Sequence, residues 1–152
     1  MNRLLIFSIL LFSLSVSAQR NPFSNLTEKN GKIGIGTNAP DELLTVKGKI
    51  HTQEVRVDLD GAVAPDYVFE KYFNGFSEAM PHYKLISLEE LEVFIKENKH
   101  LPNVPSAETM QNEGISLKEM NLILLQKIEE LTLYTLQQQK EIDALKEKIL
   151  KK

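Results

Sequence analysis

The chain has 152 residues, a formal net charge of -3 from 18 basic and 21 acidic side chains, and no cysteine. The absence of thiols excludes a disulfide framework, a thiolate zinc site, a cysteine nucleophile and lipidation on cysteine. The basic residues are scattered, so the sequence lacks the concentrated positive face that grips a nucleic-acid backbone, and no nucleic-acid partner is expected.

Residues 1–18 have the pattern of a signal peptide. Arg3 precedes a largely apolar run from Leu4 to Val16, and the small residues of a cleavage site follow at Val16-Ser17-Ala18. The run is shorter than the roughly 20 apolar residues that span a bilayer. We expect cleavage before Gln19 and a mature protein that is secreted, periplasmic or held at the cell surface, with no membrane span after cleavage.

Residues 19–31 are polar and are predicted to form a flexible lead-in. Residues 32–62 are predicted to form a β-rich unit, because isoleucine alternates with glycine from Lys32 to Gly36 and β-type residues return at Leu43–Val46. The stretch Ile50–Leu59 alternates apolar and charged residues, which predicts a strand with one buried face.

The glycines of this unit do not form a nucleotide-binding loop. Gly31, Gly34 and Gly36 run in the reverse of the dinucleotide spacing and lead to Pro40 instead of opening a helix. We therefore expect no bound cofactor, and interpret these glycines as sites of close backbone approach.

Residues 63–115 are predicted to form a small mixed region. Its first part is rich in turn residues and carries five aromatic rings that are expected to form a satellite core: Tyr67, Phe69, Tyr72, Phe73 and Phe76. Ser87 and Glu90 then form a capping box that begins a helix of about three turns. Pro102 and Pro105 impose an extended segment, after which Ser106 can cap a short helix that ends near Gly114.

Residues 116–152 form the longest uninterrupted pattern, and it predicts a coiled coil. A second capping box, Ser116 to Glu119, opens this segment, and neither glycine nor proline occurs after it. The predicted oligomerisation seam comprises the a positions Asn121, Ile128, Thr135, Ile142 and Ile149 and the d positions Leu117, Leu124, Leu131, Gln138 and Leu145.

A helix of this length cannot bury its whole apolar stripe on so small a body, so the chain is predicted to associate with itself. Glu141 at g and Lys146 at the following e have the spacing of an ion pair across a parallel interface. Isoleucine at a with leucine at d favours two strands, whereas Met120 at g and Leu125 at e widen the apolar face and suit three strands or docking on the body. Dimer and trimer both stay open on these grounds.

No group of residues predicts an active site. His51, His82 and His100 lack the spacing of metal ligands, and Ser87 and Ser106 are explained as helix caps. The carboxylate pairs Glu89-Glu90 and Glu129-Glu130 are expected on solvated helix faces. We predict that the protein is not an enzyme and has no catalytic, cofactor-binding or metal-binding residue.

Several blocks of the sequence resemble a known class. Gly34-Ile35-Gly36-Thr37-x-x-Pro40, followed by Leu43 or Leu44, Val46, Gly48 and Ile50, resembles a recurring unit of bacterial and phage tail-fibre and adhesin-like proteins. Later blocks resemble the C-terminal segment of secreted fibre-like proteins of Gram-negative bacteria: Asp66–Glu70, Tyr83–Leu91, His100–Ala107, Gly114–Asn121 and Leu124–Tyr134. The similarity covers roughly residues 32 to 142.

The layout is also similar to the endosialidase-type intramolecular chaperone, which trimerises fibres through a C-terminal helical bundle and then cleaves itself off. The Ser-Asp cleavage dyad of that family, followed by Arg-Leu-Lys, is absent between Asp60 and Lys84. The resemblance therefore implies a role in assembly, with a trimer favoured, and does not imply autoproteolysis.

Together these patterns predict an α+β protein with a short β-rich stalk or head, a small helical region and a long C-terminal helix in a parallel coiled coil. The expected function is structural: a secreted, fibre-like or adhesin-like module whose coil sets the oligomeric state. The alternative is a binding module, in which the region from Tyr67 to Pro105 recognises a surface glycan or protein and the coil makes it multivalent.

Overall fold

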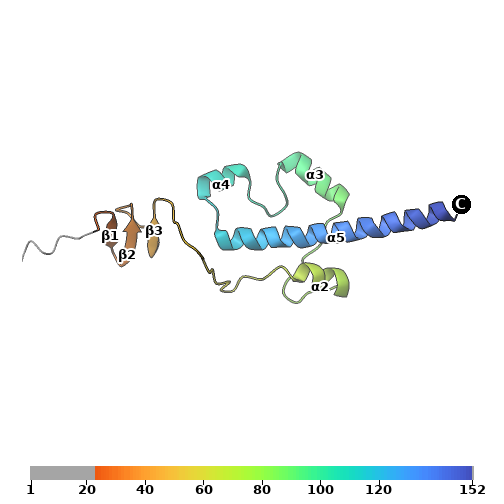
Figure 1. Cartoon of the computed structure of the whole chain (residues 1–152), viewed down its shortest axis with the longest axis horizontal. Coiled ribbons are helices and arrows are strands. Elements are labelled where there is room, and N and C mark those ends of the chain that lie inside the picture. The colour runs from red at the N-terminus through yellow and green to blue at the C-terminus, as the bar shows by residue number, and fades with distance from the viewer. Residues whose placement is uncertain (1–22, 152) are drawn as a thin grey trace, which may run out of the picture. The chain divides into compact units, whose positions relative to one another are not determined.

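The computed structural model describes residues 23–151, so the predicted leader and its cleavage site lie outside the described residues. The chain divides into two compact units, residues 1–55 and residues 56–152. The described part of the first unit contains three strands, and that of the second contains four helices (Figure 1). The α+β class predicted from the sequence is therefore confirmed.

The first unit is a small three-stranded sheet of β1 (Leu26–Lys29), β2 (Lys32–Ile35) and β3 (Leu44–Val46), in that order. β1 pairs with β2 in antiparallel fashion, and β2 pairs with β3 in parallel. The strands β1 and β2 are joined by Asn30 and Gly31, which both have positive φ. This backbone matches the right-handed twist of a two-residue hairpin, and asparagine followed by glycine tolerates it best.

Two sequence predictions for this unit are wrong. The expected flexible lead-in contains β1, because the hairpin turn lets Leu26–Lys29 pair with β2. Residues 50–59 form no strand, and Ile50, Val55 and Val57 are exposed. A strand needs a neighbour for its backbone hydrogen bonds, and the alternating pattern alone does not supply one.

The interpretation of the glycines as sites of close approach agrees with the geometry at Gly34. This residue lies in the middle of β2 and is buried. A Cβ atom at this position would overlap the backbone carbonyl oxygen of Thr37. Glycine is thus required where the chain turns tightly from β2 toward Pro40.

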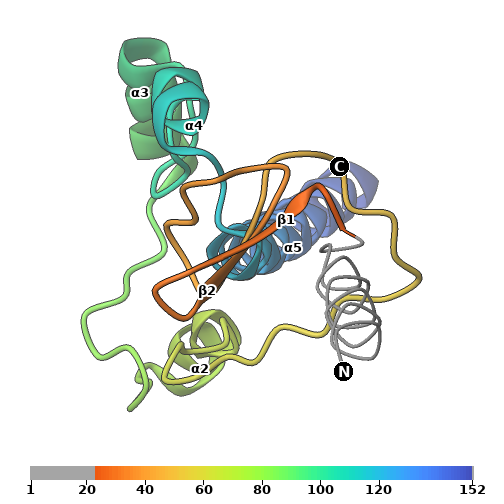
Figure 2. The ribbon, with the colours of Figure 1, turned by 90° about the vertical axis from the view of Figure 1, so that its left-hand side faces the viewer.

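The second unit is arranged around α5 (Leu117–Leu150). Figures 1 and 2 show α2 (Tyr67–Asn74) on one side of α5 and α3 (Leu88–Asn98) with α4 (Ala107–Glu113) on another. The predicted helices at α3 and α4 are confirmed. Ser87 and Glu90 complete the capping box of α3, and the Ser106 hydroxyl accepts a hydrogen bond from the backbone N–H of Thr109.

The core of this unit lies between α2 and α5. Tyr67, Val68 and Leu133 form a buried cluster, and Phe69, Tyr83 and Leu85 pack against it. The sequence did not predict α2, and its aromatic residues separate in the structure. Tyr67 is buried and Phe69 is half-buried, whereas Phe73 and Phe76 are exposed. The prediction that all five rings form a core is therefore wrong, because Tyr72 and Phe73 lie in the exposed last turn of α2 and Phe76 follows its end at Gly75.

Candidate functional site: the seam of the C-terminal helix

The helix α5 forms because its start is capped and because Leu117–Leu150 contains no glycine or proline that would interrupt its backbone hydrogen bonds. The Ser116 hydroxyl accepts a hydrogen bond from the backbone N–H of Glu119 at 3.4 Å. The helix then continues for 34 residues. At 1.5 Å per residue this is about 50 Å of helix, so α5 presents two long and chemically different faces.

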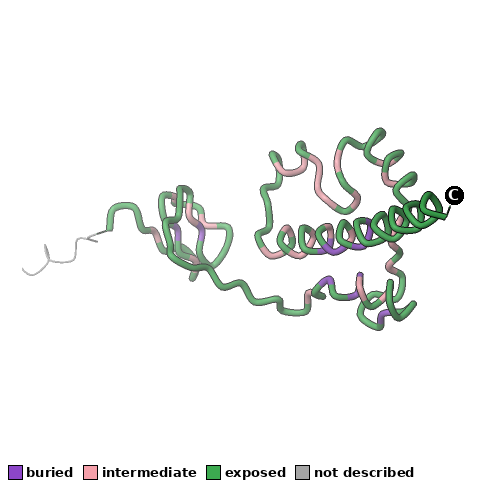
Figure 3. Tube along the Cα trace, turned by 45° about the vertical axis from the view of Figure 1, so that its right-hand side comes forward, coloured by how far each residue is buried: buried purple, intermediate pink, exposed green. Residues whose placement is uncertain are grey.

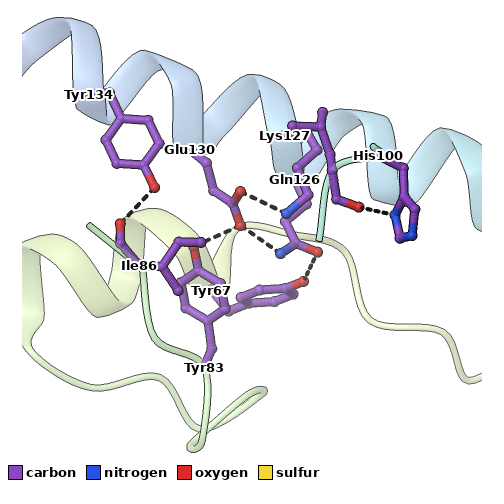
Figure 4. A network of polar contacts seen from close by, with 9 residues as sticks. Tyr67, Tyr83, Ile86, His100, Gln126, Lys127, Glu130 and Tyr134 are labelled. Carbon is purple, nitrogen blue, oxygen red and sulfur yellow. Dashed lines mark hydrogen bonds and ion pairs between the residues drawn. The ribbon is translucent and has the colours of Figure 1, made fainter. Parts of the chain in front are cut away.

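One face of α5 packs within the chain, and we call it the inner face. It consists of Gln126, Glu129, Glu130, Leu133 and Tyr134. Four of these residues are buried, and Glu130 is half-buried. Figure 4 shows how this face meets Tyr67 of α2 and the segment around Tyr83. The inner face holds the helix to the body through both apolar and polar contacts.

The polar contacts of the inner face form a continuous network. Tyr67 Oη donates to Gln126 Oε1 at 3.0 Å, and Gln126 Nε2 donates to Glu130 Oε1 at 2.7 Å. Tyr83 Oη donates to the same Glu130 oxygen at 3.1 Å, and Lys127 Nζ pairs with Glu130 Oε2 at 2.8 Å. A separate bond joins Tyr134 Oη to the carbonyl oxygen of Ile86 at 2.7 Å. Glu130 is thus the acceptor at the centre of the network.

Burial and the nearby Glu130 carboxylate together raise the pKa of Tyr83 far above its usual range. The pKa values of Tyr67 and Tyr134 are raised for the same two reasons, burial first. Each phenol therefore stays protonated and serves as a hydrogen-bond donor.

Glu129 is the least satisfied group of the inner face. The residue is buried, and its Oε2 atom has no hydrogen-bond partner. Burial, and after it the charge of Asp66, raises the pKa of the Glu129 carboxyl. The prediction that Glu129 and Glu130 lie on a solvated face is therefore wrong. Both carboxylates point toward the body, where α2 and the Tyr83 segment cover them.

The other face of α5 carries the predicted seam, and every seam position is exposed. Ile128 and Leu131 are 60% and 64% exposed, whereas Leu133 on the inner face is 0% exposed. Figure 3 shows the change along α5, with buried residues confined to the part of the helix that faces α2. The structure therefore places all the seam residues together on one helix, and no described part of the chain buries any of them.

The polar seam residues differ in how they are satisfied. Thr135 Oγ1 donates to the carbonyl oxygen of Leu131 at 2.9 Å, which satisfies its hydroxyl within the helix. Serine and threonine commonly bond back in this way. The flanking charges have local partners as well: Glu141 accepts from Gln137 at 3.4 Å, and Lys146 lies 3.5 Å from Asp143. These exposed contacts are weak enough to exchange for contacts with another chain.

A cavity of about 410 Å³ lies beside the network and is lined in part by His82, Tyr83, Lys127 and Glu130. Its Glu130 carboxylate already receives bonds from Tyr83, Gln126 and Lys127. The described residues contain no cluster of three or more metal-ligating side chains. Residues 23–151 also contain no helix that is long and apolar enough to cross a membrane.

Comparison with protein-family models, with curated proteins and with solved structures returned no match. The functional argument therefore rests on the chain's own residues. The heptad pattern of the sequence predicts the seam, which stays a prediction, but the sequence analysis missed the inner face. One signal for that face was present, since Gln126, Glu129, Glu130 and Leu133 recur at the spacing of one helix face. Three of these four residues are polar, and a polar stripe on a helix is usually solvated, so this spacing does not by itself predict a packed face.

Proposed function

We propose that the chain is a secreted, non-enzymatic structural protein that assembles with copies of itself through the seam of α5, as a parallel coiled coil. A trimer is favoured over a dimer by the resemblance to fibre-like proteins. One observation carries the proposal: the heptad residues of α5 are exposed while the opposite face of the same helix is packed. The body packs on the inner face of the helix and leaves the seam exposed.

Burial energetics support this assembly. Seven seam residues are leucine or isoleucine and are 46% exposed or more: Leu117, Leu124, Ile128, Leu131, Ile142, Leu145 and Ile149. Covering the exposed half of such a side chain contributes about 1 kcal/mol, since full burial is worth roughly 1.5 to 3 kcal/mol. Summed over the seven residues this is about 7 kcal/mol per copy, which works against an association cost of roughly 4 to 15 kcal/mol.

The test is the solution mass of the mature chain, measured by light scattering over a range of concentrations. The wild-type chain is expected to be a trimer or a dimer. Replacing Ile128 and Leu131 with glutamate should give a monomer, because it puts unpaired charge into the seam.

The matched control replaces Leu136 and Ala144 with glutamate. Both are exposed apolar residues of α5 that lie outside the heptad seam, so the control should keep the wild-type mass. A wild-type chain that is monomeric at every concentration would refute the proposal.

A second candidate function is recognition of a surface glycan or protein, and the exposed rings at the end of α2 favour it. Phe73 is 65% exposed and Phe76 is 53% exposed, and Tyr72 stacks edge-on against Phe73 with ring centroids 5.0 Å apart. Exposed aromatic residues that lie together often mark an interaction surface. Replacing Phe73 and Phe76 with alanine should abolish cell-surface or glycan-array binding without changing the oligomer mass. Unchanged binding would remove this candidate.

A further inference from the structure

The three-stranded sheet of the first unit has no apolar core among the described residues. Only Gly34 and Thr45 are buried between residues 23 and 55, and neither has a large apolar side chain. A small sheet is stable only when a hydrophobic face of it packs against another surface. The apolar side chains of this unit therefore need a partner surface that residues 23–55 do not supply.

The two faces of the sheet differ in composition. Directly opposed residues of paired strands lie on the same face, and successive residues of a strand lie on opposite faces. One face, which we call the apolar sheet face, therefore carries two cross-strand rows: Leu26, Ile35 and Val46, and Glu28, Ile33 and Leu44. On this face, Ile33 is 42%, Ile35 is 41% and Leu44 is 58% exposed.

The opposite face is covered by the chain's own loop between β2 and β3. The Thr45 hydroxyl on this face donates to Asp41 Oδ1 at 2.7 Å and accepts from the Asp41 backbone N–H at 3.1 Å. Thr27, in the same cross-strand row, donates its hydroxyl to Asn38 Oδ1 at 3.0 Å. The unit thus covers its more polar face and leaves the apolar sheet face exposed.

The chemistry of the apolar sheet face favours an uncharged, apolar occupant. Glu28 is the one charged residue among the strand residues of this face, and its carboxylate already accepts a hydrogen bond from the Gly31 N–H at 2.8 Å. With the predicted leader removed, the residues of this sequence outside 23–151 are Gln19–Pro22 and Lys152, and none has a large apolar side chain. A second copy of the chain, in contrast, carries an identical apolar face with the same need for cover.

We propose that the apolar sheet face packs against the same face of other copies in the oligomer. A parallel coil joins identical chains in the same direction, so it brings their sheet units together at a high effective concentration. Sheets that pack face to face lie about 10 Å apart, and this distance buries Ile33, Ile35 and Leu44 of each copy. The inference rests on the proposed self-association and adds to it a second contact surface, in the first unit.

The test uses the absence of cysteine from the chain. Ile35→Cys places one thiol on the apolar sheet face of the mature chain, and its alkylation by a maleimide is timed in the oligomer and in the chain dissociated by Ile128→Glu and Leu131→Glu. The thiol should react at least tenfold more slowly in the oligomer, because contact with another copy excludes the reagent. Leu44→Cys, on the same face but in β3, should behave in the same way.

The matched control is Ile50→Cys, at a position outside the strands that is 68% exposed. Its thiol should react at the same rate in the oligomer and in the dissociated chain. A second measurement requires no thiol: Ile35→Glu should raise the dissociation constant of the oligomer at least tenfold, and Ile50→Glu should leave it within twofold, as judged by sedimentation equilibrium.

Equal alkylation rates at position 35 in an intact oligomer and in the dissociated chain would overturn the inference and leave the proposed coil in place. If both rates were fast, the face would await a different protein, and if both were slow, the chain itself would cover it. Equal dissociation constants for the two glutamate variants would also overturn the inference. A wild-type chain that is monomeric at every concentration would overturn the proposed function together with it.

Discussion

The inner face and the seam of α5 belong to one helix but differ in composition and in burial. The inner face contains two glutamates, a glutamine and a tyrosine, and it is covered by α2 and the Tyr83 segment. The seam contains mostly leucine and isoleucine, and it is exposed along its full length. By hydropathy alone, the seam would be buried and the inner face would be solvated. Within the chain, the inner face is therefore held by directional hydrogen bonds together with Leu133, and the more apolar stripe stays exposed.

This contrast separates two kinds of stability. Contacts of the inner face fold a single chain, and they depend on a few positions between Gln126 and Tyr134. Contacts of the seam are expected to depend on concentration and on the whole length of α5. Substitutions on the inner face should therefore change the stability of the fold, and substitutions in the seam should change association.

The largest effect is expected when both faces are removed by deleting residues 116–152. The body would lose Leu133 from the cluster with Tyr67 and Val68, and Tyr83 would lose its Glu130 acceptor. Residues 56–115 should then unfold without cooperativity or aggregate. Circular dichroism melts at equal concentration provide the measurement. A truncated chain that melts cooperatively at the wild-type temperature would show that the body folds without α5.

Deleting only residues 138–152 should weaken association through the seam and leave the contacts of the inner face in place. This removes Ile142, Leu145 and Ile149 from the seam and no buried residue from the described chain. The dissociation constant should rise by at least about a hundredfold, because every copy loses three apolar seam residues at about 1 kcal/mol each. The near-ultraviolet signal of the tyrosines should persist. Loss of that signal together with association would mean that the distal helix also supports the fold.

Leu133→Ala changes a residue of the inner face and none of the seam. Leu133 is fully buried, so the substitution should lower the free energy of unfolding by about 2 to 4 kcal/mol through lost burial and the cavity left behind. Urea titration at one fixed protein concentration measures it. Leu150→Ala, at a position that is 86% exposed, should change the value by less than about 0.5 kcal/mol. Equal effects of the two variants would contradict the assignment of the faces.

Tyr83→Phe removes one donor from Glu130 and should lower the free energy of unfolding by about 1 to 2 kcal/mol. A hydrogen bond to a charged acceptor has this value, and here Gln126 and Lys127 remain to satisfy the carboxylate. The control is Tyr72→Phe, which removes a hydroxyl from an exposed tyrosine of α2. Denaturant titration of both variants in parallel distinguishes a bonded hydroxyl from a solvated one.

The smallest effect is expected at Glu129 and concerns pH. Burial and Asp66 raise the pKa of Glu129, so the folded chain holds this proton more tightly than the unfolded chain. The contribution of Glu129 to stability therefore falls as pH rises above its ordinary value of 4.5. Glu129→Gln should raise the urea midpoint near neutral pH and change it little in mild acid. Glu147→Gln, on the exposed part of α5, should shift neither.

The sequence was most informative where local chemistry decides the structure. The serine caps at Ser87, Ser106 and Ser116 marked the starts of α3, α4 and α5, because a hydroxyl at such a position satisfies free backbone N–H groups of the first turn. The hairpin of β1 and β2 was missed although Asn30-Gly31 is a strong turn signal. The polar residues around it were taken for a linker.

The sequence was least informative where partners lie far apart along the chain. Tyr67 and Gln126 are separated by 59 positions, and Tyr83 and Glu130 by 47. Hydropathy patterns cannot foresee that a glutamate will be covered by a tyrosine from another element. The same limit explains residues 50–59, which alternate apolar and charged side chains but have no adjacent strand among residues 23–151.

The network around Glu130 also fixes how far α5 is turned about its own long axis. A helix held only by leucine and valine can roll toward the next apolar side chain, about 100° per residue, at modest cost. Here such a roll would leave the Glu130 carboxylate without Tyr83 and the Tyr67 hydroxyl without Gln126. Every copy of the chain should therefore present its heptads at the same angle before it meets another copy. For the proposed self-association, this removes a search over the rotation of α5 before two seams can pair.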